Sequence, residues 1–408
     1  MKIIKTKIPF FFNQKSFHFY LIGAFSFFLP LWPDVAVLMI ILLFVNNLLS
    51  GALFKNFKQV LQPLPLTSIS LYLIYLVGLT YTTDMADGLS DVETKLTLLV
   101  FPLLLFTGPQ LSKKNYNQIF MAFAIACALV ILRGGFLTFY YNMVINEVGY
   151  FSVLTGIHSS FFCLYLGVAI FFLAQQITQE GKEALSKKKK NLYIGLLLFL
   201  SVSIFFLMAR MGFFTLVFLF SIFYITHQFK NGKTSTGLMK MIAVWCLVAT
   251  IAWLIPTSKI SIYGKINIPK VNITKKEEAD VRIPIWISSL EVARKQILFG
   301  VGTGDVHVEL EKVYQKRNFK LGIQHEFNPH NQYLQTSIAL GLIGLSILLI
   351  NFLYPMKLAF EKEHTIYLFF LLLFGMGCLT ESLLERESGV LFFAFFNSLF
   401  ARELYKRE

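Results

Sequence analysis

Long runs of apolar residues, separated by short polar stretches, dominate the chain from residue 17 onward. Runs of this length are typical of transmembrane helices, because about 20 apolar residues cross the hydrocarbon core of a bilayer. The pattern predicts an all-α integral membrane protein with about twelve transmembrane helices, of which the fourth and seventh are short. The expected spans are 17–32, 35–54, 65–82, 95–108, 117–141, 159–176, 192–208, 211–227, 241–256, 332–354, 365–380 and 388–402.

One long hydrophilic stretch, residues 257–331, interrupts this pattern. It divides the chain into nine expected transmembrane helices in 1–256, a loop, and three transmembrane helices followed by a short tail in 332–408. Within the loop, residues 283–297 place apolar and charged side chains at roughly helical spacing, which predicts an amphipathic helix. Such a helix either lies on the bilayer surface or packs on the loop's own core, and the pattern favours neither.

Composition and charge agree with a membrane protein. The chain is 56% hydrophobic with 44 Phe, and its mean hydropathy is +0.63, whereas soluble domains are roughly 45–50% apolar. Its net charge of +14 does not indicate a nucleic-acid partner, because the basic residues gather in alternate short connections between spans. These connections are 2–15, 55–58, 113–114, 182–190, 230–240, 357–362 and 402–407. The positive-inside rule then places both termini in the cytoplasm and the long loop outside.

Two further patterns exclude other arrangements. Residues 1–15 are basic and precede an apolar run, as in a signal peptide, but no small-residue cleavage site follows, so we expect a retained first helix. The four cysteines all fall in expected spans and form no CxxC pair. They are therefore expected to be buried apolar residues, with neither a disulfide framework nor a zinc site.

His330 is the strongest candidate for a catalytic residue, since it stands directly before the apolar span that starts at 332. An imidazole titrates near neutral pH and can take the proton of an attacking hydroxyl, which contributes about 10²–10⁴-fold to a rate. Its neighbour Asn331 is a candidate for binding substrate. The alternative is that both residues only cap the helix, a position that Asn favours.

Two arginines are expected to face the same outer surface. Arg210 lies between the seventh and eighth spans, which are joined almost without a loop, and a cation so near hydrocarbon usually has an anionic partner. Arg282 begins the amphipathic segment of the long loop. A planar guanidinium matches phosphate oxygens bidentately, so the pair could hold a diphosphate. The alternatives are an ordinary salt bridge or snorkelling for Arg210 and a solvated loop position for Arg282.

Four other residues are weaker candidates on this face. His158 begins the sixth span, where it either binds acceptor or caps its helix. Glu381, Glu385 and Arg386, between the last two spans, are expected to pair with the arginines or with each other, and Glu381 is also a candidate for binding substrate. Lys95 opens the fourth span and Arg133 lies within the fifth, and both are second-rank phosphate ligands.

The glycine-rich turn 300–304 superficially resembles a phosphate-binding loop. It lacks the GxGxxG spacing and the strand–turn–helix setting that such a loop needs, so we expect no nucleotide site. The chain also has no HExxH or GxSxG motif, and the long loop has no DxD-type carboxylate pair. The sequence therefore indicates neither a metal nor a cofactor.

Taken together, these elements resemble the superfamily of bacterial O-antigen ligases and O-antigen polymerases. The matching segments are 208–212, the stretch that opens at Arg282, 299–304, 330–335 with 341–345, 379–382 and 385–393. The resemblance implies a glycosyltransferase in the bacterial inner membrane that uses a polyprenyl-diphosphate-linked glycan as donor. It also implies transfer to a sugar hydroxyl of lipid A–core or a related acceptor on the periplasmic face, without a metal. By the same analogy His330 would activate the acceptor hydroxyl, while Arg210 and Arg282 would hold the diphosphate.

The sequence leaves several alternatives open. Ligases and polymerases share this layout, and we favour a ligase slightly. Ala209 stands where many relatives are expected to carry Ser, which puts the local hydrogen bonding in question. A lipid-linked glycan flippase or secondary transporter would need ionisable residues at the bilayer midplane, where only Arg133 is a candidate. A non-catalytic membrane assembly protein would tolerate replacement of His330.

Overall fold

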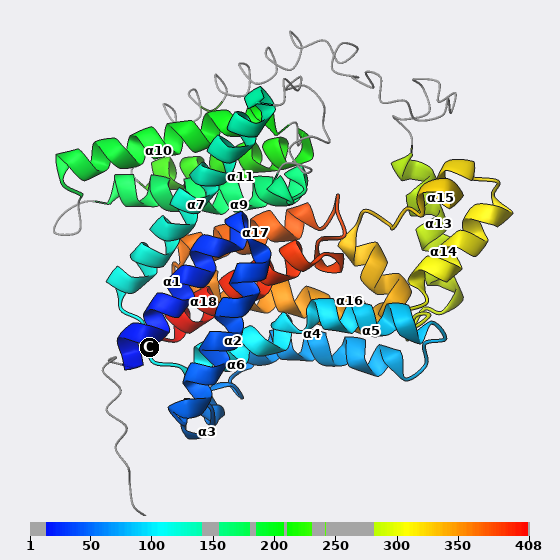
Figure 1. Ribbon diagram of the computed structural model, residues 1–408. Helices are drawn as coiled ribbons and strands as arrows, with labels where there is room; N and C mark the ends of the chain where they lie inside the picture. Colours follow the sequence, from blue (N-terminus) through cyan, green and yellow to red (C-terminus); the bar gives the residue numbers. More distant parts are fainter. Residues whose placement is uncertain are drawn as a thin grey trace, which may run out of the picture.

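The computed structural model describes residues 14–140, 155–179, 185–207, 210–230, 241 and 281–406, and in these ranges every regular element is a helix (Figure 1). The first half contains α1 (Gln14–Leu31), α2 (Pro33–Leu49), α3 (Ala52–Lys55), η1 (Phe57–Gln59), α4 (Pro63–Leu79), α5 (Met85–Lys95), α6 (Thr97–Thr107), α7 (Lys113–Tyr140) and α9 (Ser159–Thr178). The second half contains α10 (Lys187–Phe206), α11 (Arg210–Lys230), α13 (Arg282–Lys295), α14 (Val306–Lys316), α15 (Lys320–His325), α16 (Gln332–Glu361), α17 (Thr365–Gly377), η3 (Leu383–Glu385) and α18 (Glu387–Lys406).

The expected apolar spans in the described ranges all coincide with helices, which confirms the all-α class. The ninth expected span, 241–256, lies outside the described residues except for its first position. Three described helices are long and apolar enough to cross a membrane by length and composition, namely α7 over Lys113–Leu137, α9 and α16. Shorter apolar helices, including α2, α4 and α17, accompany them. The apolar helices fit a membrane protein, while the number of twelve spans stays a prediction.

The start of the fourth expected span, 95–108, differs from the expectation. Lys95 does not open the apolar helix but ends α5, a separate helix of 11 residues. Asp84 caps this helix by accepting a hydrogen bond from the backbone N–H of Asp87 at 3.1 Å. The apolar helix α6 that follows also has 11 residues, about 16 Å of helix, and so covers only part of a hydrocarbon core of about 30 Å.

Aromatic packing explains why the chain uses so many phenylalanines. Helix α18 is buried by its neighbours, and its rings stack on those of other helices, as in the parallel contact of Phe396 with Phe120 of α7 at 5.5 Å between ring centroids. Phe393 of α18 likewise stacks on Phe370 of α17. Between apolar helices in lipid, association depends on van der Waals contact and not on exclusion of water, so large flat side chains are effective.

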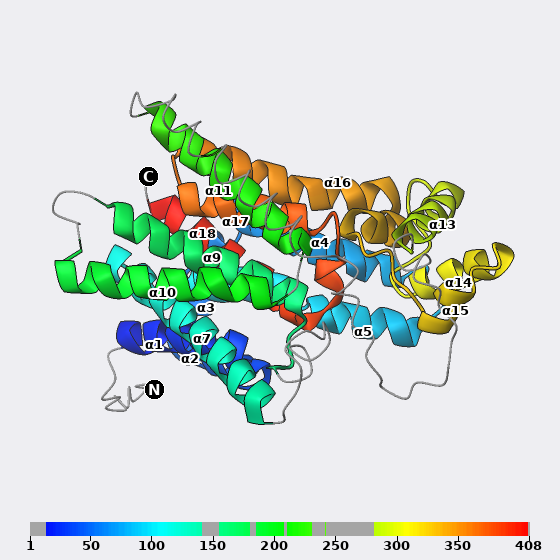
Figure 2. The ribbon, with the colours of Figure 1, turned by 90° about the horizontal axis from the view of Figure 1, so that it is seen from above.

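The loop helices α13, α14 and α15 gather at one end of the helix bundle, beside α5 and the first turns of α16 (Figures 1 and 2). The described end of α18 lies at the opposite end of the bundle. Helix α13 confirms a helix within the segment expected at 283–297, although its buried face also carries Ser288 and Ser289. Ile285 and Val292 are buried where α13 packs on α14 and α16, whereas Ile283 and Ile287 are exposed. One apolar face therefore packs on protein, and a second one remains open.

Helix α16 is broken at Gly341, where φ is 62° and ψ is −157°. The break frees backbone groups that an intact helix would pair, and residues 297–302 of the long loop pair with them. The hydrogen bonds run from Val301 N–H to Ile338 O (2.8 Å), Gly302 N–H to Ala339 O (3.0 Å), Leu342 N–H to Ile297 O (2.8 Å) and Ile343 N–H to Leu298 O (3.3 Å). Buried backbone groups need such partners, so the loop and the broken helix form one unit.

The glycine-rich turn 300–304 packs tightly against α4 and the loop that follows it. Gly304 lies so close to Asp84 that an added Cβ would meet the backbone oxygen of Asp84 at 2.0 Å. The carboxylate of Asp305 accepts hydrogen bonds from the backbone N–H groups of Thr83 and Asp84. The turn therefore has a packing role, and the strand–turn–helix setting of a nucleotide site is absent from it.

We predict that Gly341→Ala destabilises the protein by about 1–3 kcal/mol, since a residue with a Cβ is strained at positive φ and this Cβ would meet the backbone of Leu298 at 2.4 Å. The measurement is the thermal unfolding midpoint in detergent. Gly195→Ala in α10 is the matched control, because nothing lies within 4 Å of its Cβ position. An unchanged midpoint for Gly341→Ala would contradict the proposed coupling of loop and helix.

Candidate functional site

His330 lies on the short connection between α15 and α16, with its backbone in the left-handed region at φ 45°. Few residues other than glycine adopt this region, and those that do are held there by their surroundings. The side chain of Asn328 accepts a hydrogen bond from the His330 backbone N–H at 2.9 Å. The indole of Trp286 on α13 donates to the carbonyl of Pro329 at 3.1 Å. These two contacts hold in place the short segment that leads into His330.

Asn331 is the N-cap of α16, as one of the two sequence interpretations expected. Its side-chain oxygen accepts from the Leu334 N–H at 3.0 Å, and its side-chain amide donates to the carbonyl of Leu379 at 3.0 Å. Its backbone N–H donates to the hydroxyl of Ser382 at 3.2 Å. These contacts attach the start of α16 to the connection between α17 and η3. A role of Asn331 in binding substrate stays a prediction.

Glu381 joins three of the candidate elements. One carboxylate oxygen lies 3.3 Å from Nδ1 of His330. The other lies 3.8 Å from a guanidinium nitrogen of Arg282 and accepts a hydrogen bond from the hydroxyl of Ser160, in the first turn of α9, at 3.5 Å. The expectation that Glu381 pairs with an outer arginine therefore agrees with this geometry. The structure brings together residues that are more than 200 positions apart in the chain.

The charges around Glu381 decide its ionisation. Burial opposes a charge on this carboxyl, but the hydrogen bond and charge of His330, with the charges of His158 and Arg282, outweigh burial and lower its pKa. An ionised carboxylate can only accept, so Nδ1 of His330 carries the proton of this contact. Nε2 is then the basic nitrogen. This arrangement, a carboxylate that orients an imidazole, is the one that prepares a histidine to act as a general base.

The structure also places three further candidates, His158, Arg210 and Arg133, on their helices. His158 is the N-cap of α9, where Nδ1 accepts from the Ser160 N–H at 3.4 Å, and burial lowers its pKa. Arg210 is the first residue of α11 that the structure describes, one position before the span expected at 211–227, and a role for it stays a prediction. The end of α10 and the start of α11 lie on the side of the bundle that is nearer to α13 (Figure 2). Arg133 is an exposed residue of α7.

Lys95 is fully buried and already paired. Its ammonium lies 2.6 Å from Asp91 and 3.1 Å from Glu385, and 4.5 Å above the ring of Tyr75. Burial opposes a charge on Lys95, but the two carboxylates outweigh it and raise its pKa. The side-chain amide of Gln332 also donates to Glu385 at 3.0 Å. Lys95 therefore connects α5 to η3 and to the start of α16, and a role for it in phosphate binding remains a prediction.

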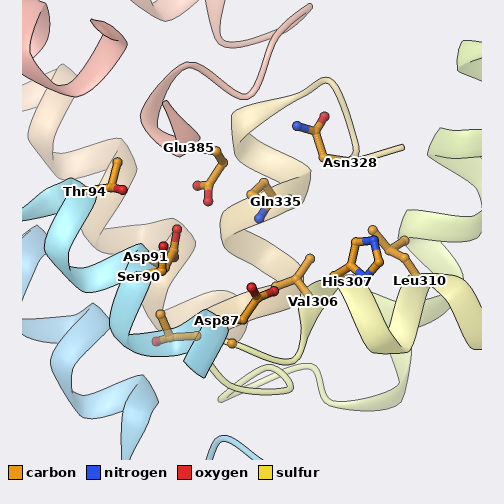
Figure 3. A pocket seen from close by; sticks show the side chains of 12 residues that line it. Asp87, Ser90, Asp91, Thr94, Val306, His307, Leu310, Asn328, Gln335 and Glu385 are labelled. Atoms are coloured by element: carbon orange, nitrogen blue, oxygen red, sulfur yellow. The ribbon is translucent and has the colours of Figure 1, made fainter. Parts of the chain in front are cut away.

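The sequence analysis missed the helix α5 and the acidic face that it presents. Asp87, Asp91 and Lys95 are spaced four residues apart, which places them on one side of a helix and was the available signal. This face lines a cavity of about 170 Å³, together with Gln335 of α16 and Glu385 of η3 (Figure 3). Among the described residues, no group of three or more His, Cys, Asp or Glu side chains is arranged to hold a metal ion.

Comparison with known proteins finds a likeness over part of the chain. Residues 195–349 match a family model described as O-antigen ligase. The matched stretch contains Arg210, Arg282 and His330, whereas Glu381 and His158 lie outside it. Curated proteins gave no match to the chain.

We predict that Lys95→Met destabilises the protein by about 3–5 kcal/mol, because it leaves buried carboxylates without their cation. The double variant Lys95→Met/Glu385→Gln is expected to recover much of this loss. Lys312→Met is the control, since Lys312 forms an exposed ion pair with Glu309 of a kind that contributes about 0–1 kcal/mol. Equal thermal midpoints for the Lys95 and Lys312 variants would show that the buried group does not stabilise the fold.

Proposed function

We propose that this protein is a member of the O-antigen ligase and polymerase superfamily, and that it transfers a glycan from a polyprenyl-diphosphate carrier to a sugar hydroxyl. The match of residues 195–349 to the O-antigen ligase family model supports this proposal. The observation that carries the proposal is the contact of His330 with Glu381, and of Glu381 with Arg282, beside apolar helices. Such a reaction needs three groups close together: a base, a carboxylate that orients the base, and a cation for the leaving group. The reaction would occur at the periplasmic face of the bacterial inner membrane.

In this mechanism Nε2 of His330 takes the proton of the acceptor hydroxyl while the hydroxyl oxygen attacks the anomeric carbon of the donor sugar. A new glycosidic C–O bond forms, and the bond between that carbon and the diphosphate oxygen breaks. The polyprenyl diphosphate leaves with the bonding electron pair. Glu381 stabilises the imidazolium that results, because its negative carboxylate accepts the hydrogen bond from Nδ1–H and so favours a positive charge on the ring.

The arginines would act on the leaving group. The diphosphate gains negative charge as the bond breaks, and guanidinium groups placed near low dielectric stabilise that charge. Arg282 is suited to this task because its side chain is 44% exposed and its ion pair with Glu381 is loose, at 3.8 Å. A diphosphate carries more charge than one carboxylate and would draw Arg282 toward itself. Arg210, at the start of α11, is the second proposed ligand.

The orientation in the membrane follows from the same proposal. The end of the bundle that carries α13, α14 and α15 would face the periplasm, and the opposite end, where the described part of α18 ends, would face the cytoplasm (Figure 1). His158 and Asn331 would then border the acceptor beside His330. We propose a ligase slightly ahead of a polymerase, and the two differ in whether the acceptor is lipid A–core or another carrier-linked glycan.

Glycan transfer by the purified protein in nanodiscs tests the general-base role. We expect His330→Ala to lower the transfer rate by about 10²–10⁴-fold. Glu381→Gln should cause a smaller loss, because it keeps the shape but removes the charge that stabilises the imidazolium. His325→Ala is the matched control, since His325 is an exposed residue of the same loop. The assay uses carrier-linked oligosaccharide with lipid A–core or carrier-linked acceptors and includes neither ATP nor metal.

Transfer that survives in a folded His330→Ala variant would exclude the general-base role. If no acceptor supports transfer but the carrier moves across liposomes that contain the protein, the protein is a flippase instead.

A separate measurement tests the arginine. Arg282→Ala is expected to slow transfer by at least tenfold, and Arg282→Lys should recover only part of the loss, because an ammonium cannot form the bidentate contact. Arg294→Ala, on the exposed side of the same helix, is the control. Transfer rates measured at saturating donor separate a transition-state effect from weaker donor binding. A normal rate in Arg282→Ala would remove this residue from the diphosphate site.

A further inference from the structure

Helix α13 carries a row of apolar side chains that no other described element covers. Ile285 and Val292 are buried on the side of the helix that packs on α14 and α16. The opposite side carries three exposed apolar residues, spaced three or four positions apart and therefore on one face of the helix, namely Ile283, Ile287 and Leu290. We call these three residues the apolar stripe of α13.

The segment that follows α13 continues the apolar stripe. The side chains of residues 297–299 (Ile, Leu and Phe) are 54%, 58% and 60% exposed, although their backbone is paired with protein. The carbonyls of residues 297 and 298 accept hydrogen bonds from the backbone N–H groups of Leu342 and Ile343. The carbonyl of Phe299 accepts from the hydroxyl of Tyr81 at 2.7 Å. A fixed backbone therefore holds three large apolar side chains outward, and a contiguous surface of this kind marks a contact with a membrane or another protein.

The surface of α16 beside this segment changes at Gly341. Every residue of 332–340 is buried or half-buried, whereas the part of α16 after Gly341 carries exposed apolar side chains, including Leu342, Ile343, Leu349, Ile350 and Leu353. Residues 342–361 form about 30 Å of helix, which equals the thickness of the hydrocarbon core. Helix α16 is also one of the described helices that are long and apolar enough to cross a membrane. Its lipid-facing surface thus begins at Gly341, where residues 297–299 are bound.

The direction of α13 agrees with this level. Figure 1 shows α13 running across the direction of α4 and α16, and Figure 2, turned by 90°, shows it nearly end-on. A helix that crosses the spanning helices at one end of the bundle lies along the membrane surface. Helices in this position place an apolar face at the boundary between headgroups and acyl chains.

We propose that α13 and residues 297–299 lie in the bilayer leaflet on the side of the long loop, with the apolar stripe against lipid acyl chains. The partner is the bilayer because the stripe continues into the lipid-facing surface of α16. Tyr81, which holds the carbonyl of Phe299, is of the residue type that is enriched at the edge of a membrane. This inference goes beyond the proposed function and does not depend on it. The contact would hold Arg282, the first residue of α13, at the bilayer surface.

The test is lipid quenching of a bimane fluorophore on single introduced cysteines of the full chain, in nanodiscs that contain lipids with a doxyl group near the head of the acyl chain. We expect quenching at Ile287→Cys and Leu290→Cys to exceed that at Gln315→Cys by at least about twofold, because an interfacial helix buries its apolar face among acyl chains. Gln315 is the matched control, an exposed residue of α14 in the same loop. Ile350→Cys, on the exposed side of α16, is the reference for full lipid contact, and the unmodified chain treated with the same reagent gives the background from the native cysteines.

Quenching at positions 287 and 290 that does not exceed quenching at 315 would overturn the inference. A blue-shifted probe at these positions that doxyl lipids leave unquenched would overturn it as well, because a second copy or another segment of the chain would then cover the stripe. Both positions are exposed, and a variant is used only if its thermal midpoint matches that of the unmodified chain. Either position alone decides the test if the other variant does not fold. Glycan transfer is not needed for the measurement, so the two proposals can fail separately.

Discussion

The pairing of the long loop with the broken helix α16 determines where the candidate site can form. Gly341 interrupts the helical hydrogen bonds, and residues 297–302 complete them from outside the helix. The same loop segment continues into the turn that binds the connection after α4 through Asp305. Since the first turns of α16 follow directly after His330, the position of the imidazole depends on this pairing. The hydrogen bonds of residues 297–302 with α16 thus attach this part of the long loop to the helix bundle.

Two acidic residues on one short connection serve different purposes. Glu381 is partly open, and its two basic neighbours, His330 and Arg282, lie 3.3 Å and 3.8 Å from its oxygens. Such contacts can rearrange when a charged substrate arrives. Glu385 is enclosed with Lys95, and the short distances of that group fix α5 to η3 and to α16. Four residues of sequence thus separate a group suited to reactivity from a group suited to rigidity, and the difference lies in their exposure to solvent.

The sequence was sufficient for the parts of the molecule that depend on local pattern. Apolar runs predicted the helices, and the spacing in 283–297 predicted α13. The residue type and position of His330 predicted its place at the start of a helix, and Glu381 was expected to pair with an arginine. The sequence was insufficient where distant segments meet. The short helix α5 was masked by its closeness to an apolar run, and the contact of Lys95 with Glu385 joins residues 290 positions apart. The break at Gly341 also has no local signal, because its partners come from the loop.

The backbone of His330 has a consequence for how this site can change. At φ 45°, a residue with a side chain raises the free energy of the folded state by about 1–3 kcal/mol, and glycine would remove most of that penalty. Selection for stability alone would therefore favour glycine at this position. If His330 performs the proposed chemistry, stability and activity oppose each other at this position. Engineering for thermal robustness should for this reason leave residue 330 alone and seek its gains on lipid-facing helix surfaces far from the loop.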